Sequence, residues 1–184
     1  WRHPERGVVP PLDFIPLAEE TGLIVPIGGW VLTEACRQTR DWQRRFAREV
    51  PLAVSVNLSV KQFGQSSFAR TVSDTLRATG LDPRALKLEI TESFAVDDAD
   101  GTRGMLEELR RLGVRIYLDD FGTGYSSLGY LHRLPLDAIK IDRSFVMRME
   151  EGPTHMQLVR TVRDLARNIG VAAVAEGVET AAQL

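Results

Sequence analysis

The sequence predicts an α/β fold built around a mainly parallel sheet. Short apolar stretches with strand character alternate with longer helical stretches, which is typical of parallel strands joined by helices. Five of the strand-like stretches end on a residue that can bind a metal or move a proton, and successive ends lie roughly 20 to 35 residues apart. This spacing equals about one strand-plus-helix unit, so the chain is either an open doubly wound sheet or part of a (β/α)₈ barrel.

The first half of the chain is expected to contain two helices before its first strand. A short helix starts at Pro11 and is closed by Gly22, because apolar residues recur on one face between them. A longer helix is expected over 25–46, with arginines on its outer side. Residues 53–59 alternate between apolar and polar, as a half-buried strand does, and a helix over 68–79 follows.

The second half is expected to alternate strand and helix. Glycines follow the helices expected over 102–112 and 154–168, and glycine is a usual residue just beyond a helix end. The short apolar runs between the helices predict strands over 86–92, 114–120, 138–142 and 171–176. No linker or internal repeat interrupts the pattern, so we expect one domain.

The composition limits the classes of function. The formal net charge of −2 argues against a general DNA or RNA binder, which would usually carry a basic excess. The single cysteine, Cys36, cannot form an internal disulfide, and the N-terminal residues do not resemble a signal peptide. No apolar run approaches the roughly 20 residues of a membrane span. We expect a soluble, cytoplasmic domain without direct membrane contact, which is compatible with a membrane anchor elsewhere in the parent protein.

The strongest local motif runs from Leu118 to Leu128 and begins with two adjacent aspartates, Asp119 and Asp120. Adjacent carboxylates at a strand end can bridge two divalent cations, and two such metals can clamp the attacking and leaving oxygens of a phosphodiester displacement. Gly122 and Gly124 allow the following loop to turn tightly. An isolated Asp-Asp pair is more often a polar turn. The whole motif favours a metal site.

Two further polar residues fit the same chemistry, and a third is expected to have a different role. Asn57 offers a carbonyl oxygen that a hard metal ion can use, although an isolated asparagine is more often a hydrogen-bonded core residue. Glu89 suits a metal ligand. On a strand, Glu92 would point to the opposite face, so it is expected to hold a neighbouring loop instead. Taken alone, each glutamate is more often a solvated charge.

A lysine and two glutamates extend the set toward the C-terminus. Lys140 lies between two isoleucines, and a lysine there is costly to bury without a carboxylate or phosphate partner. It could orient a nucleophilic water or neutralise charge on a phosphoryl group. Glu176 stands at a strand end and Glu179 lies just beyond it. These oxygen-rich side chains favour Mg²⁺ or Mn²⁺ over zinc.

Together these motifs resemble the EAL domain, the cyclic di-GMP phosphodiesterase family of bacterial second-messenger signalling. The matching strings occur in family order at residues 14–19, 55–59, 89–92, 119–127, 140–145 and 175–179. The resemblance implies a modified TIM-type (β/α)₈ barrel whose first strand is antiparallel, with about five of the parallel strands in this chain. Residues 1–184 would then be an EAL domain that is incomplete at both ends, and we expect weak or no activity from these residues alone.

The resemblance also implies an activity and its cofactors. The expected reaction is hydrolysis of one phosphodiester bond of cyclic di-GMP to pGpG with two Mg²⁺ or Mn²⁺ ions, and Ca²⁺ is expected to inhibit it. One metal would be held by Asn57, Glu89 and Asp119. The second would share Asp119 and add Asp120 and Glu176.

The remaining roles follow from the same resemblance. Lys140 is expected to position the attacking water, with Asp120 and Glu176 as further catalytic groups, and Glu179 to act behind the metal ligands or toward substrate. Glu92 is expected to anchor an active-site loop that the family links to homodimer formation, and this loop comprises Phe121, Gly122, Thr123, Gly124, Tyr125, Ser126 and Ser127.

Two other functions compete with the phosphodiesterase. A non-catalytic cyclic di-GMP receptor or protein-interaction domain could use the same scaffold, although the intact set of ligand positions disfavours it. An unrelated metal-dependent barrel enzyme is the third, and the order of the motifs makes it the weakest of the three.

Overall fold

The computed structural model describes residues 1–47, 49–92, 99–122 and 131–184. Its main sheet contains five strands, and every neighbouring pair is parallel. In sheet order they are β3 (Val54–Asn57), β4 (Leu86–Thr91), β5 (Arg115–Phe121), β6 (Ala138–Ile141) and β7 (Ala172–Ala175). The spatial order equals the order along the chain, as in consecutive units of a barrel. A doubly wound sheet reverses its order at a switch point, so the structure excludes that alternative.

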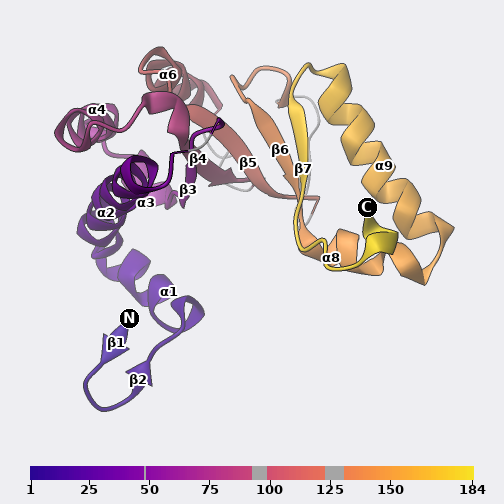
Figure 1. Ribbon diagram of the computed structural model, residues 1–184, viewed down its shortest axis with the longest axis horizontal. Helices are drawn as coiled ribbons and strands as arrows, with labels where there is room; N and C mark the ends of the chain where they lie inside the picture. The colour runs from indigo at the N-terminus through magenta and orange to yellow at the C-terminus, as the bar shows by residue number, and fades with distance from the viewer. Residues whose placement is uncertain (48, 93–98, 123–130) are drawn as a thin grey trace.

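Helices pack along one side of this sheet. Helix α2 contacts β3 at one edge and α9 contacts β7 at the other, with α4 and α6 between them (Figure 1). The five long helices confirm the sequence prediction to within three residues at each end. They are α1 (Pro11–Thr21), α2 (Ile24–Arg45), α4 (Phe68–Thr79), α6 (Ala99–Arg111) and α9 (Pro153–Asn168).

Several short elements escaped prediction, and local capping explains two of them. The strand expected over 53–59 ends at Asn57 because Ser59 begins helix α3 (Val60–Phe63), where it forms a capping box with Gln62. Asp142 does not continue β6, because its carboxylate caps helix α8 (Arg143–Met147). The others are strands β1 (Arg2–His3) and β2 (Gly7–Val8), and the 3₁₀ turns η1 (Pro83–Ala85), η2 (Arg148–Glu151) and η3 (Ala181–Gln183).

The hydrophobic core lies between the strands and the helices. Alternate strand residues such as Leu88, Ile116 and Ile139 are fully buried, as are Leu32 of α2 and Leu106 of α6. Burying one such side chain contributes about 1.5–3 kcal/mol. Because side chains alternate across a strand, the residues between these apolar positions point to the other side of the sheet. That side carries the polar residues singled out in the sequence.

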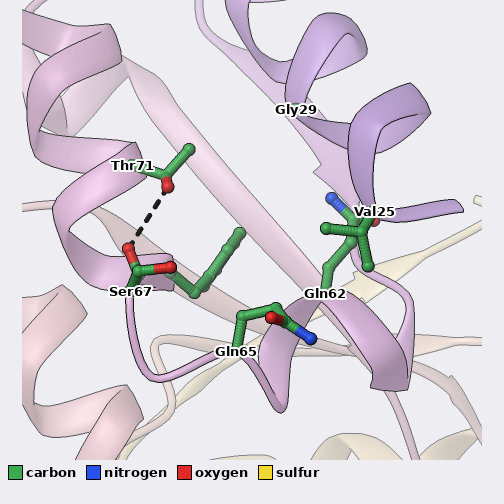
Figure 2. Close-up of a pocket in the computed structure, with 7 residues that line it drawn as sticks. Val25, Gly29, Gln62, Gln65, Ser67 and Thr71 are labelled. Atoms are coloured by element: carbon green, nitrogen blue, oxygen red, sulfur yellow. Dashed lines mark hydrogen bonds between the residues drawn. The ribbon is translucent and has the colours of Figure 1, made fainter. Parts of the chain in front are cut away.

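A small cavity lies within the helical layer, between α2, α3 and α4 (Figure 2). It has a volume of about 90 Å³, and Val25, Gly29, Gln62 and Phe68 are among its lining residues. None of the predicted site residues lines it. In the described part of the chain, no helix combines the length and apolar character needed to cross a membrane.

Candidate metal centre

Lys140 lies at the centre of a cluster of carboxylates. Its ammonium nitrogen Nζ lies 2.7 Å from Oε2 of Glu89, 2.9 Å from Oδ1 of Asp119 and 2.6 Å from Oε1 of Glu176. The lysine stands on β6, whereas its partners come from β4, from β5 and from the residue that follows β7. The parallel sheet therefore brings together residues that are far apart in the sequence. A buried lysine requires a carboxylate or phosphate partner, and these three carboxylates are the partners of Lys140.

A β-bulge explains how two adjacent aspartates serve one site. In the β5–β6 ladder Leu118 pairs with Ile139 and Phe121 pairs with Ile141, so Asp119 and Asp120 together lie opposite the single residue Lys140. Asp120 adopts a left-handed backbone conformation with φ of 53°. On a regular strand these two side chains would point to opposite faces. The bulge removes that alternation.

The bulge creates a group of carboxylates that could hold a metal ion. Ligand oxygens of Asp119, Asp120 and Glu176 all lie within 4.8 Å of one another. Their carboxylates come from the end of β5 and from the residue that follows β7, on either side of Lys140. All the donors are oxygens, which suits a hard divalent cation such as Mg²⁺, Mn²⁺ or Ca²⁺.

The charge balance of the cluster also fits bound cations. Glu89, Asp119, Asp120 and Glu176 carry four formal negative charges, whereas Lys140 contributes one positive charge. Burial raises the pKa of Asp120 above its ordinary value, and repulsion from Asp119, Asp142 and Glu176 raises it further. Divalent cations would relieve this repulsion.

Lys140 stays protonated despite its burial. Burial by itself lowers the pKa of the ammonium group and is the largest single influence. Hydrogen bonds to Glu176, Glu89 and Asp119 together outweigh it and raise the pKa well above the ordinary value for lysine. The side chain is therefore a hydrogen-bond donor and a fixed positive charge, and it is not a base at neutral pH.

The predicted ligands from the first two strands of the sheet also lie next to each other. Asn57 is the register partner of Glu89 in the β3–β4 ladder, and the backbone N–H of Leu58 donates to the carbonyl of Glu89 over 2.9 Å. Glu89 is buried, whereas Asn57 is exposed. Asn57 therefore stands beside Glu89 at the rim of the cluster.

Glu92 and Glu179 have different surroundings. Glu92 is buried, and its Oε2 accepts a hydrogen bond of 3.0 Å from the backbone N–H of Gly122, directly after β5. Glu179 is exposed, and its backbone N–H donates to Oε1 of Gln183. In the described residues no hydrogen bond or ion pair joins the Glu179 side chain to the carboxylate cluster. Of the predicted loop, Phe121 ends β5 and Gly122 follows it, while residues 123–127 lie outside the described residues.

One group near the cluster was missed by the sequence reasoning. Asp142 directly follows β6, and its Oδ1 accepts hydrogen bonds from the backbone N–H of Ser144, at 3.0 Å, and from the Ser144 hydroxyl. The hydrogen bond from Ser144 lowers the pKa of Asp142. The sequence carries a signal for this group, namely an aspartate followed two residues later by a serine. Both residue types are favoured at the start of a helix. The short helix that Asp142 begins, α8, packs close to the cluster.

The EAL domain family model matches the whole chain, residues 1–184. The chain belongs to the EAL domain family. This confirms the resemblance seen in the sequence motifs. It also confirms the barrel interpretation of the five parallel strands, since solved EAL domains superpose on the chain over its full length.

Individual relatives agree with this assignment. The chain is 46% identical over 183 residues to the bifunctional diguanylate cyclase/cyclic di-GMP phosphodiesterase MucR of Pseudomonas aeruginosa. This match covers 100% of this chain and 26% of that protein. It is 39% identical over 181 residues to the cyclic di-GMP phosphodiesterase PdeR of Escherichia coli, covering 98% of this chain and 27% of that protein. The chain thus spans about a quarter of the length of these two relatives.

A solved structure provides the matching comparison in three dimensions. The PaMucR phosphodiesterase in a c-di-GMP complex has a TM-score of 0.91 and 46% sequence identity. The match covers 100% of this chain and 73% of that chain. The backbone that carries Lys140 and its carboxylates is therefore the EAL domain backbone.

Proposed function

We propose that this EAL domain hydrolyses one phosphodiester bond of cyclic di-GMP to give linear pGpG in bacterial second-messenger signalling. The observation that carries the proposal is the group of carboxylates around Lys140, in which Asp119, Asp120 and Glu176 can share a metal ion. The relatives MucR and PdeR are named as cyclic di-GMP phosphodiesterases, which supports the choice of substrate.

The metal ligands divide into two overlapping sets. Asn57, Glu89 and Asp119 would hold one cation, and Asp119, Asp120 and Glu176 would hold a second. Mg²⁺ or Mn²⁺ is the proposed metal, and Ca²⁺ is expected to inhibit. When bound, such a pair of cations stabilises charge on the attacking and leaving oxygens of a phosphodiester.

The protein side chains contribute positioning and proton transfer. Lys140 remains protonated, so its positive charge is proposed to orient the attacking water and to stabilise the negative charge that develops on the phosphoryl group. Asp120 is the proposed acceptor of the proton from the attacking water, because its carboxylate lies beside those of Asp119 and Glu176 in the cluster. Glu176 holds Lys140 in place through the 2.6 Å contact.

The alternative is a receptor that binds cyclic di-GMP without cleaving it. Every predicted ligand position in the chain carries an oxygen donor, and Lys140 contacts three of the four carboxylates. A binding module has no need of this complete set, so the geometry favours hydrolysis.

A product assay separates the two functions. The full-length protein is incubated with cyclic di-GMP and Mg²⁺ or Mn²⁺, and pGpG is separated by chromatography. Asp119→Ala is the test variant, and Asp164→Ala, which removes an exposed carboxylate on α9, is the matched control. Product formed by the wild type and the control alone supports the phosphodiesterase. Tight binding without product would establish the receptor instead.

Two further expectations stay predictions. Homodimer formation is checked by light scattering of the full-length protein, and cytoplasmic placement is checked by cell fractionation.

A further inference from the structure

Helix α8 packs against both turns that follow the metal-ligand strands. Gly122 lies two residues after Asp120 with φ of 97°, and a Cβ atom at this position would lie 3.0 Å from Cε2 of Phe145. Gly177 directly follows Glu176 with φ of 67°, and a Cβ atom there would lie 3.0 Å from Cβ of Arg143. Side chains of one short helix therefore contact the backbone at both positions.

The helix is itself firmly held. Its N-terminus is capped by Asp142, and Val146 on its inner side is fully buried. It begins three residues after Lys140, so the strand that carries the lysine leads directly into it. Phe145 is half-buried, with its ring edge against the Gly122 turn. The ring thus lies between its helix and the Gly122 turn.

The Gly122 turn is constrained from two directions. On one side its N–H donates to Glu92 from the end of β4, and on the other it meets the ring of Phe145. Just before it, Asp120 holds a left-handed conformation that is unfavourable for a residue with a side chain. Such conformations persist only where the surrounding structure fixes them. Among the described residues, Glu92 and Phe145 both contact this turn.

We propose that Phe145 is a positioning residue for the metal centre. Its ring holds the Gly122 turn and thereby keeps the carboxylates of Asp119 and Asp120 on the same side of β5. Phe145 acts through Gly122 and needs no contact with metal or substrate. This inference rests on the proposed function, since it assigns Phe145 to the same site.

The test measures Mn²⁺ affinity by calorimetry in the full-length protein, without substrate, and then kcat and KM. Phe145→Ala is expected to weaken Mn²⁺ binding about 10-fold or more, in the range found when groups behind metal ligands are removed. The value of kcat should fall more than KM rises. Phe145→Leu, which restores most of the apolar volume against Gly122, should recover most of the affinity.

Val146→Ala is the matched control, because it removes buried volume from the same helix without touching Gly122. It should lower Tm and leave Mn²⁺ affinity within about twofold of the wild type. Wild-type affinity in Phe145→Ala, or an equal loss in Val146→Ala, would overturn the proposal. A wild type that binds Mn²⁺ but forms no pGpG refutes the phosphodiesterase, while the affinity series still decides the role of Phe145.

Discussion

The Nζ atom of Lys140 lies 2.7 Å from Oε2 of Glu89, and both side chains are buried on the polar side of the sheet. The two residues are 51 positions apart in the sequence and stand on β4 and β6, with one strand between them. Asp119, on the strand between them, contacts the same nitrogen. One ammonium group therefore links the carboxylates of neighbouring strands.

Removing this charge should destabilise the metal-free protein. In Lys140→Met the buried carboxylates of Glu89 and Asp119 lose their ammonium partner. Removing one partner of a buried ion pair lowers the free energy of unfolding by about 3–5 kcal/mol. Thermal denaturation measures the change. Adding Mn²⁺ should raise the Tm of Lys140→Met more than that of the wild type, because the cation replaces the lost positive charge. Equal shifts in both proteins would contradict this explanation.

The hydrogen bond from Gly122 to Glu92 predicts a graded pair of variants. Glu92→Ala removes the acceptor for a buried N–H, which costs about 1.5–3 kcal/mol for a bond to a charged group. Glu92→Gln keeps a carbonyl oxygen in the same place and should lose less than half of that stability. Urea denaturation measures both variants. The idea is wrong if the two variants lose stability equally.

The Asp142 cap predicts a pH-dependent effect on stability. Asp142→Ala should lower the free energy of unfolding by about 1 kcal/mol at neutral pH, because the N–H of Ser144 loses its acceptor. The pKa of Asp142 is lowered in the folded state, so its contribution is present above the pKa of the unfolded chain, about 3.9, and is lost as pH falls through the folded value. The gap between wild type and variant should therefore close in acid.

Asp142→Asn separates capping from charge. Asparagine caps a helix about as well as aspartate. This variant should keep most of the stability at neutral pH and should lack the acid-dependent loss. An Asp142→Ala gap that stays constant from neutral pH to pH about 2 would count against the assignment.

Cys36 should be unreactive while the protein is folded. The side chain is fully buried in α2, and burial raises the pKa of its thiol to about 11. Only the thiolate attacks a disulfide reagent, so native protein at pH about 8 should react slowly and denatured protein at once. Absorbance of the released thiol follows the reaction. Fast stoichiometric reaction of a folded sample would show that α2 opens readily.

The sequence predicted the strands and the site residues because both have strong local signals. Apolar runs that end in a polar residue marked β4, β5 and β6, and Lys140 between two isoleucines required buried partners. Which carboxylates become the partners of Lys140 depends on which strands are neighbours in the sheet. That order comes from long-range pairing, which periodicity does not encode.

The bulge at Asp119 and Asp120 is what the sequence analysis could not supply. Adjacent side chains on a strand are expected to point to opposite faces of the sheet. Only the shift in register before the pair with Ile141 shows that these two aspartates depart from that rule. The contact of Phe145 with Gly122 was hidden for a similar reason, because α8 is five residues long and lies below the length at which helical periodicity is visible.

The measurement that tests the metal centre most directly is a calorimetric titration of Mn²⁺ into the full-length protein. The shared role of Asp119 predicts two bound ions per chain in the wild type, loss of both in Asp119→Ala, and loss of one in Glu176→Ala. Asp164→Ala should bind Mn²⁺ as the wild type does. Wild-type binding by Asp119→Ala would show that the bulged carboxylates are not the metal site, and the proposed mechanism would fail with them.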